Sequence, residues 1–443
     1  SDREQLTTAQ ELKEQYWKRT VGPVRTALER TLNILDRYGL EMEMGHKEVG
    51  GVKAKMGHSG HYDHIMEQLE VDWKYSDALQ AADNEKQVKY IVRDIFRLHG
   101  LDVTFMAKPM EGVAGSGEHT HLGLAAKLKD GRVVSMFSSK DGKDFLNVIG
   151  YGALMGILNN YEVINPFISA TNDAFNRLKP GFEAPVCTVT SMGHSVEAPS
   201  RNRTVLAGLI REAGNPLATR FELRSPNPNS NTYLVIAASY MAMLDGIRAA
   251  VTAGKTPAEL EKSISKKKGE EDFYLETGRE YRSEKDVFAH YTPEERDDIF
   301  GRPPETVWEN ITAFDKYPEK LEIFKSGGVM TDIVLESYRE AIVNQWATEL
   351  YNRIIPNAMD TVRSCRKLHN ESATDYDIGM WAKISAQRDK IAKNTMNKFC
   401  ILKKISDALD KADYNLASRL QLEAQREIRK LIDMYSSYKR NLL

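Results

Sequence analysis

The spacing of apolar residues changes along this chain, and that change restricts the possible folds more than any other feature. Between residues 7 and 38 apolar side chains recur at helical spacing, and Gly39 follows as a stop signal. From residue 40 to about 249, strand-like runs such as 101–106 and 132–137 alternate with helical segments. From residue 329 onward nearly the whole pattern is helical. The sequence therefore predicts an α+β region followed by a helical C-terminal part.

The apolar stripes of the C-terminal part are expected to pack against their own domain or a sister subunit. They consist of Ala392, Met396, Phe399, Leu402, Ile405 and Leu409, then Leu416, Leu420, Ile428, Leu431 and Ile432. Two further helices are predicted to begin at Thr256 and Thr292. Each of these threonines is followed by a proline and, three residues on, by a glutamate, which is the pattern of a capping box.

Size and charge exclude several classes of protein. The 443 residues, 41% of them hydrophobic, suffice for one large domain with additions or for two domains. A formal net charge of -2 supplies no overall field that would attract nucleic acid or anionic lipid. We therefore predict no nucleic-acid partner, and any anionic substrate has to be held by local groups.

Cysteine usage and hydropathy indicate a cytoplasmic protein that is not associated with a membrane. Cys187, Cys365 and Cys400 have no paired spacing, which argues against a disulfide framework and a structural zinc site. No uninterrupted apolar run is long enough to span a bilayer, and no leader pattern opens the sequence. The first residues, SDRE, are interpreted as residues from within a longer chain.

A glycine-rich run, residues 112–123, is the first segment suited to hold a ligand. Its glycines let the backbone approach a ligand closely, and His119 and His121 would follow one face of a strand. A tight turn that enters a strand with surface histidines explains the same residues equally well.

Charged and apolar residues alternate at positions 220–224. In a strand this pattern sends Arg220, Glu222 and Arg224 to one face, although a solvated edge strand would look the same. Arg201 and Arg203 add guanidinium groups suited to forked contacts with phosphate oxygens. This density of arginine indicates a polyphosphate ligand.

Three acidic residues from separate segments complete the candidate set. Glu183 follows a Pro-Gly turn and precedes another proline, so its carboxylate would ride on a stiff loop and act as a base. Glu48 and Glu70 lie beside strand-forming residues and offer the hard oxygen donors that suit magnesium or manganese. Taken singly, Glu183 is equally explained by a surface turn, whereas Glu48 and Glu70 are better explained as surface carboxylates.

Together and in this order, these runs resemble the signature blocks of the glutamine synthetase superfamily. Lys108-Pro109 with residues 115–121 (GSGEHTH) looks like the family's ATP-binding signature. Asn165-Pro166 with residues 177–185 looks like its substrate flap, and residues 220–228 with 244–247 look like its last metal and arginine block. The resemblance is close over residues 40–249 and looser as far as about 345.

The resemblance implies two or more Mg²⁺ or Mn²⁺ ions per site and ATP as a co-substrate. Glu48 and Glu70 would help bind one ion, and His119 and Glu222 the second. Metal ions and arginines would together neutralise the charge that spreads over phosphoryl oxygens.

The resemblance also implies roles for the remaining candidates. Gly115, Arg177 and Arg224 would bind the carboxylate substrate, and Arg224 would also hold the phosphoryl group in transit. Arg203 would contact the ATP phosphates, while His121 and Arg220 would lie along the nucleotide. Glu183 would close the site, exclude water and take a proton from ammonium.

Three departures separate this chain from the usual family pattern. The family has a pair of glutamates upstream of the Glu48 block and an amino-terminal β-grasp domain, and this sequence matches neither. Each metal ion is therefore short of a ligand. We favour a longer native chain over loss of the reaction as the explanation. Ala114 and Gly123 replace a usual asparagine and serine, which puts the identity of the acid in doubt. Residues 52–67 form an insertion whose His58, His61 and His64 are interpreted as part of a surface excursion.

The implied architecture is an α+β catalytic domain in which helices wrap a curved antiparallel sheet. We predict a helical lead-in at 1–39, the catalytic domain at 40–345 and a helical extension at 346–443, similar to that of the large type III enzymes. The family implies a dodecamer of two stacked hexameric rings, with active sites between neighbouring subunits.

The predicted reaction joins ammonia to glutamate at the expense of ATP, through γ-glutamyl phosphate. A γ-glutamyl-amine ligase that uses a larger amine is an alternative favoured by Ala114. A non-catalytic assembly protein is a second alternative, favoured by the missing glutamate pair.

Overall fold

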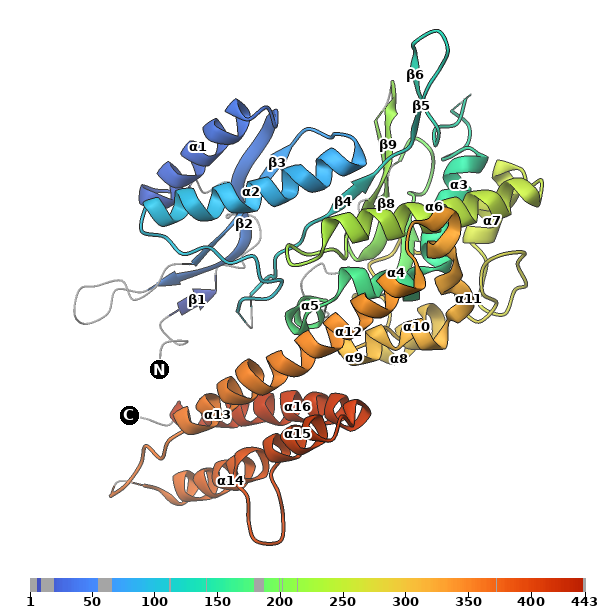
Figure 1. The fold of residues 1–443 in the computed structure, drawn as a ribbon. Helices are drawn as coiled ribbons and strands as arrows, with labels where there is room; N and C mark the ends of the chain where they lie inside the picture. The colour runs from blue at the N-terminus through green and yellow to red at the C-terminus, as the bar shows by residue number, and fades with distance from the viewer. Residues whose placement is uncertain are drawn as a thin grey trace. The chain divides into compact units, whose positions relative to one another are not determined.

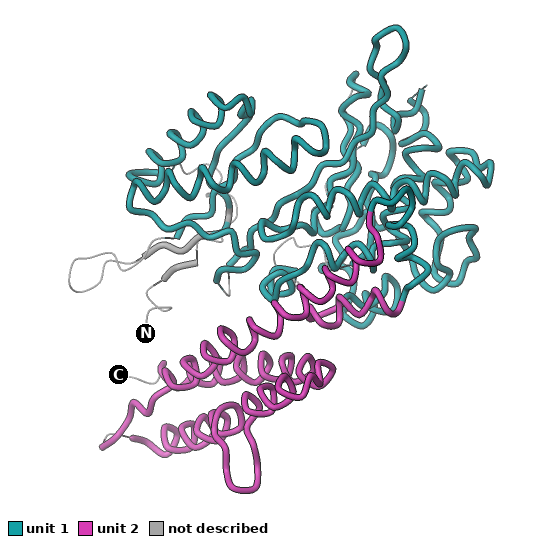
Figure 2. The backbone as a smooth tube through the Cα atoms, viewed as in Figure 1, with its two compact units in different colours: residues 1–303, 317–329 teal, residues 304–316, 330–443 magenta. Residues whose placement is uncertain are grey.

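The chain divides into two compact units in the computed structural model (Figures 1 and 2). The residues described are 6–8, 20–54, 66–110, 113–140, 142–178, 187–198, 200, 202–212, 214–371 and 373–440. Unit 1 comprises residues 1–303 and 317–329, and unit 2 comprises residues 304–316 and 330–443. Unit 2 takes in residues 330–345, which the sequence analysis assigned to the catalytic domain. The functional domain boundaries stay a prediction.

The described part of unit 1 contains three separate sheets. Their orders are β1-β2-β3, β4-β9-β8-β7 and the hairpin β5-β6. The strand bounds are β1 Leu6–Thr8, β2 Met42–Ala54, β3 Met66–Trp73, β4 Thr120–Leu122, β5 Ala125–Lys127, β6 Val133–Ser135, β7 Cys187–Ser191, β8 Val205–Glu212 and β9 Asn215–Leu223. The lead-in at 1–39 was predicted to be helical, but it also contains the strand β1, which pairs with β2.

The prediction of one antiparallel sheet is wrong in two respects. Glu48 and Glu70 lie on the first sheet, whereas Glu222 lies on β9 of the second. In the second sheet β7 and β8 run parallel, since the segment between them crosses back to the same end of the sheet. Residues 101–106 form no strand either; Val103 and Phe105 pack against a hydrophobic core instead of pairing with a neighbour.

The first sheet is covered by two helices, α1 (Gly22–Arg37) and α2 (Ala78–Leu98), which lie side by side (Figure 1). Leu28 and Leu35 of α1 and Val92 and Phe96 of α2 belong to one buried cluster with residues of β2 and β3. This layer holds β2 and β3, and therefore Glu48 and Glu70, on a packed support.

Two apolar helices, α3 (Val148–Asn159) and α6 (Thr232–Thr252), cross in backbone contact beside the second sheet. A Cβ atom on Gly156 would lie 2.0 Å from the carbonyl oxygen of Ala242, and one on Gly246 would lie 2.1 Å from that of Gly152. Glycine is therefore required where the helices meet.

Among the described helices, α6 alone has the length and composition to cross a membrane, and half of its apolar window is buried in the protein.

Shorter helices complete unit 1. They are α4 (Tyr161–Ile168), α5 (Asn172–Arg177), α7 (Pro257–Ile264), α8 (Pro293–Phe300), α11 (Pro318–Leu321) and the 3₁₀ segment η2 (Glu322–Gly328). The capping boxes predicted at Thr256 and Thr292 are confirmed: each threonine caps α7 or α8 and exchanges bonds with the glutamate three residues on.

The described part of unit 2 contains helices and no named strand, as predicted for the C-terminal part. Its elements are α9 (Val307–Ile311), α10 (Ala313–Lys316), α12 (Asp332–Glu349), the π-helical η3 (Leu350–Ile354), α13 (Ile355–Ser364), α14 (Asp375–Ala392), α15 (Ile401–Asp410) and α16 (Tyr414–Lys439). Most predicted stripe residues, Leu402, Ile405 and Leu431 among them, lie in its core. Met396 and Phe399 are exposed instead, because they lie in the turn between α14 and α15.

We predict that Gly156→Ala lowers the free energy of unfolding by about 2 kcal/mol or more, since the new methyl group forces the α3 and α6 backbones apart. Urea unfolding followed by circular dichroism measures the loss. Gly379→Ala in α14 is the control: a Cβ there meets nothing within 4 Å, so a gain of roughly 0.5–1 kcal/mol is expected. Equal stability of the Gly156 variant and the wild type would contradict the close crossing.

Candidate active site

Strands β2 and β3 bring His46, Glu48 and Glu70 together. His46 lies directly opposite Glu70, and Glu48 lies two residues further along β2 on the same face. The His46 ring lies 3.7 Å from Glu48 (Nδ1 to Oε1) and 3.6 Å from Glu70 (Nε2 to Oε2). One possible ligand atom from each residue lies within 4.8 Å of the others, a spacing that suits one metal ion. Sequence reasoning missed His46, although its i, i+2 spacing with Glu48 was a signal.

The first cluster crowds negative charge in a partly buried place. Burial, a hydrogen bond with Glu48 and the charge of Asp72 together raise the pKa of Glu70 to about 8. Burial also raises the pKa of Asp72. A divalent cation would take the place of the proton and stabilise the ionised carboxylates. Two carboxylates and an imidazole are a donor set that fits Mg²⁺ or, because of the nitrogen, Mn²⁺.

A second cluster forms where β4 meets β9. Nδ1 of His119 lies 3.1 Å from Oε1 of Glu222, and Nη1 of Arg224 donates to the same oxygen at 2.6 Å. Burial favours a raised pKa for Glu222, but the bond with His119 and the charge of Arg224 outweigh it and hold the pKa at about 2. Burial lowers the pKa of His119. The carboxylate is therefore charged and the imidazole neutral at pH 7, which are the forms that bind metals.

The strand pattern predicted around Glu222 is confirmed. Phe221 and Leu223 are fully buried, while Arg220 and Glu222 are half-buried on the opposite face of β9. Phe221 stacks on Phe137 with ring centroids 4.9 Å apart. Packing on one face of β9 thus fixes the charged groups on the other.

A loop formed by residues 113–119 joins the two clusters. The side chain of Gln68 on β3 accepts a hydrogen bond from the backbone N of Gly50 at 2.7 Å and donates to the carbonyl oxygen of Gly115 at 2.9 Å. Glu70 lies two residues beyond Gln68, and His119 four residues beyond Gly115. The strand that carries one cluster is therefore tied to the loop that carries the other.

The glycines of this loop make room for Arg177, at the end of α5. A Cβ atom on Gly115 would lie 2.4 Å from the carbonyl oxygen of Ala107 and 2.9 Å from Cγ of Arg177. A Cβ atom on Gly117 would lie 2.6 Å from Nη2 of Arg177. The glycines allow close approach, as expected, and the group that approaches them is a protein side chain.

Arg177 is a buried cation. Its guanidinium donates to the carbonyl oxygens of Ser225 at 2.9 Å and Arg224 at 3.0 Å, and no carboxylate of the described residues lies within ion-pair distance. Burial and the charge of Arg224 lower the pKa of Arg177 to about 10, so it stays protonated at pH 7. A buried charge without a counter-ion is costly, so this guanidinium favours binding of an anion.

Comparison with known proteins decides the family. The family profile described as "Glutamine synthetase, catalytic domain" matches residues 6–277. This chain belongs to the glutamine synthetase superfamily. It is similar to the glutamine synthetase of Clostridium saccharobutylicum, with 36% identity over 234 residues, 52% of this chain and 44% of that one. It is also 36% identical to that of Pyrococcus horikoshii over 211 residues, 48% of this chain and 40% of that one.

A solved structure supports the glutamine synthetase catalytic-domain fold. The chain is similar to a structure titled "CryoEM Plasmodium falciparum glutamine synthetase", with a TM-score of 0.54 and 19% sequence identity, over 82% of this chain and 63% of that one. The chain spans less than half the length of the curated glutamine synthetases it matches. The resemblance predicted from the sequence is thus confirmed at the level of the family.

The residues that the glutamine synthetase signature assigns to the nucleotide also meet. Nε of Arg220 donates to Nδ1 of His121 at 2.9 Å. Burial and the charge of Arg220 lower the pKa of His121 to about 4, although Glu222 opposes the shift, so the ring is neutral and its proton lies on Nε2. Arg203 is exposed, and its carbonyl oxygen accepts a bond from Nε of Arg224 at 3.1 Å. Arg203 is therefore attached to the second cluster.

Other predicted residues remain outside this arrangement. Glu183, Arg201 and the three insertion histidines, His58, His61 and His64, lie outside the described residues. In the described part of the chain, no third His, Cys, Asp or Glu joins His119 and Glu222 in a three-ligand group.

A partly buried charge network beside His119 was not predicted. Lys89 of α2 lies 2.6 Å from Oε1 of Glu85 and 3.0 Å from Oε2 of Glu118, and the hydroxyl of Thr232 donates to Glu118 at 3.0 Å. Burial and the charge of Glu85 raise the pKa of Glu118 to about 8, since two carboxylates share one ammonium group. The network ties α2 and α6 to the loop that carries His119.

We predict that Glu118→Gln changes the free energy of unfolding at pH 7 by less than about 1 kcal/mol, because the amide replaces a carboxyl that already holds a proton. Lys89→Met leaves the partly buried carboxylate of Glu85 and the carboxyl of Glu118 without their shared cation and costs about 3–5 kcal/mol. Urea unfolding of both variants measures the contrast, and similar losses in the two would contradict the shared proton.

The same network predicts a pH dependence. The pKa of Glu118 is raised in the folded state from its ordinary value of 4.5 to about 8, so the folded protein binds more protons between these values. The contribution of Glu118 to stability is therefore complete below pH 4.5 and is lost as the pH rises to 8. Urea unfolding at pH 5 and pH 8.5 measures this slope, which Glu118→Gln should reduce.

Proposed function

We propose that this protein is a glutamine synthetase that ligates ammonia to L-glutamate through γ-glutamyl phosphate, with ATP as the phosphoryl donor. The proposal rests on one observation. The loop of residues 113–119 connects two clusters of metal-type donors, His46 with Glu48 and Glu70 and His119 with Glu222, and it also contacts the buried guanidinium of Arg177, which has no carboxylate partner among the described residues. Cation sites beside an anion-binding arginine suit a phosphorylated acid.

The donor sets fit divalent metal ions. Glu48 and Glu70, with His46, would hold one ion, and His119 with Glu222 would hold the other. When bound, the ions supply positive charge to the phosphoryl oxygens. The raised pKa of Glu70 supports this fit, because a carboxylate cluster that retains a proton is short of a cation.

The side chains of this chain account for the remaining steps. Arg177 and Gly115 bind the substrate carboxylate, and Arg224 holds the phosphoryl group while a γ-carboxylate oxygen attacks the γ-phosphorus of ATP and ADP leaves. Arg203, His121 and Arg220 bind the nucleotide. Glu183 accepts a proton from ammonium, which leaves ammonia. The ammonia then attacks the acyl carbon, and inorganic phosphate leaves.

The assembly is proposed from the family alone. Glutamine synthetase membership supports a cytoplasmic homo-oligomer, and we propose a dodecamer of two hexameric rings in which a neighbouring subunit completes each site. The catalytic domain is proposed to span residues 40–345 and the helical extension residues 346–443.

Product analysis with ammonia and a panel of primary amines tests the reaction. We expect ATP-dependent formation of glutamine with ammonia to exceed ligation of any amine in the panel. Turnover only with a larger amine would favour the γ-glutamyl-amine ligase that Ala114 supports, since a small side chain replaces the usual asparagine. Absence of turnover with every nitrogen donor would favour the non-catalytic alternative.

We predict that Glu222→Ala abolishes turnover, a loss of at least about a hundredfold, because it removes a metal ligand and leaves the charge of Arg224 unpaired. Steady-state assays at saturating Mg²⁺ measure the loss. Asp130→Asn is the matched control: it removes a carboxylate in the exposed β5–β6 turn that pairs only with Arg132 among the described residues. Retained turnover in a folded Glu222 variant would remove Glu222 from the site.

A further inference from the structure

The segment around Glu284 forms a polar clamp on the loop that carries Arg203. It begins where residues 281–283 run beside the end of β7: the backbone N of Thr190 donates to the carbonyl oxygen of Tyr281 at 2.8 Å, and that of Ser283 donates to the carbonyl oxygen of Thr190 at 3.0 Å. These bonds place Glu284 at the point where the chain leaves β7.

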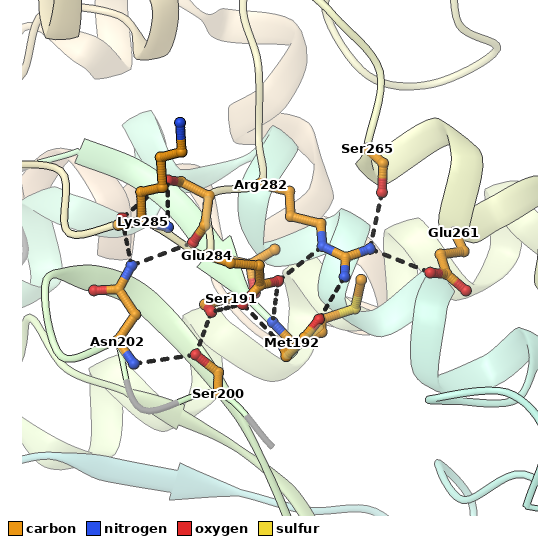
Figure 3. Close-up of polar contacts among 12 residues, drawn as sticks. Ser191, Met192, Ser200, Asn202, Glu261, Ser265, Arg282, Glu284 and Lys285 are labelled. Carbon is orange, nitrogen blue, oxygen red and sulfur yellow. Dashed lines mark hydrogen bonds and ion pairs between the residues drawn. The ribbon is translucent and has the colours of Figure 1, made fainter. Parts of the chain in front are cut away.

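Glu284 binds the last residue of β7 and the two residues that follow it. Its carboxylate accepts hydrogen bonds from the backbone N atoms of Met192 at 3.1 Å and Gly193 at 3.0 Å, and from the hydroxyl of Ser191 (Figure 3). Nε of Arg282 donates to the same carboxylate at 2.9 Å. Four donors converge on one side chain, so the start of the loop is held by a charged acceptor.

Arg282 closes the clamp from the other side. Its Nη2 donates to the carbonyl oxygen of Gly193 at 2.8 Å, and its Nη1 reaches Glu261 at 3.2 Å and Ser265 at 3.0 Å (Figure 3). Gly193 has φ +107°, and a Cβ atom there would lie 2.3 Å from the carbonyl oxygen of Ala198. Both polar groups of the Gly193 backbone are therefore fixed in a conformation that needs glycine.

The far end of the loop is held by the same segment. Nδ2 of Asn202 donates to the carbonyl oxygens of Ser283 at 3.2 Å and Lys285 at 2.7 Å, and the backbone N of Asn202 donates to Ser200 at 3.1 Å. Ser200 in turn contacts the hydroxyl of Ser191. The side chain of Asn202 also accepts from Thr204, whose hydroxyl accepts a bond from the backbone N of Val287.

Arg203 lies between these two anchored residues. Its carbonyl oxygen accepts the bond from Nε of Arg224, and Arg224 donates to Glu222. The backbone at 202–204 thus sets the direction of the Arg203 side chain. It also supplies the carbonyl oxygen for one of the two described hydrogen bonds that orient the Arg224 guanidinium. A shift of this backbone would move both arginines.

We propose that Glu284 is a positioning residue for the phosphate side of the nucleotide site, acting through the loop between β7 and β8 on Arg203 and Arg224. The inference rests on the proposed function, because it assigns Arg203 and Arg224 to phosphate groups. Glu284 itself touches no substrate; it sets the geometry of the groups that do.

The test compares nucleotide binding with metal binding in the full chain. Glu284→Ala and the milder Glu284→Gln are titrated with a non-hydrolysable ATP analogue by calorimetry and with Mn²⁺ by electron paramagnetic resonance, below the onset of thermal unfolding. We expect the dissociation constant for the analogue to rise roughly tenfold in the alanine variant and less in the glutamine variant, which keeps one acceptor oxygen. Mn²⁺ binding at His46, Glu48 and Glu70 should not change.

Lys285→Ala is the matched control, since Lys285 is exposed and binds Asn202 only through its backbone carbonyl. Unchanged analogue affinity in a folded Glu284 variant would overturn the inference and leave the proposed function intact. A parallel loss of analogue and Mn²⁺ binding would also overturn it, because that result indicates a general structural role. If the wild-type protein binds no nucleotide, the proposed function fails and the inference with it.

Discussion

The close approach of backbone to side chain at Gly115 and Gly117 is the constraint on which the rest of the site depends. Any Cβ atom at these positions would collide with Arg177 or with the backbone of Ala107. Because the loop carries no side chains there, Arg177 reaches the carbonyl oxygens that follow β9, and Gln68 reaches the loop from β3. One turn therefore fixes the distance between two sheets that have no strand pairing in common.

The charges of the site are arranged in opposed sets. Burial, together with the neighbouring carboxylates of Glu48 and Asp72, raises the pKa of Glu70, so this group retains a proton at pH 7. Arg177 is buried with only carbonyl partners among the described residues, and Arg224 uses one of its Nη groups to neutralise Glu222. Such a site favours binding of both cations and anions. Bound cations would neutralise the carboxylates, and a bound anion would neutralise the guanidinium groups.

Sequence reasoning reached the elements whose signal is local. The alternation at 220–224 predicted the two faces of β9 because period two follows directly from strand geometry, and the capping boxes at Thr256 and Thr292 depend only on residues three apart. It failed where the decisive partner is distant. His46 faces Glu70 across a hairpin, Lys89 meets Glu118 from another element, and Glu284 clamps a loop more than 80 residues upstream. The parallel pairing of β7 and β8 was missed for the same reason, because register between strands is a property of the fold and not of either strand.

The proposed function requires two metal ions that bind on the two sheets and lie beside nucleotide phosphates. Crystals of the full chain grown with Mn²⁺ and a non-hydrolysable ATP analogue would reveal both ions by anomalous diffraction. We expect one manganese peak bounded by His46, Glu48 and Glu70, a second bounded by His119 and Glu222, and phosphate density next to Arg203 and Arg224. Manganese peaks away from both clusters, or an analogue bound elsewhere on the protein, would contradict the proposed function.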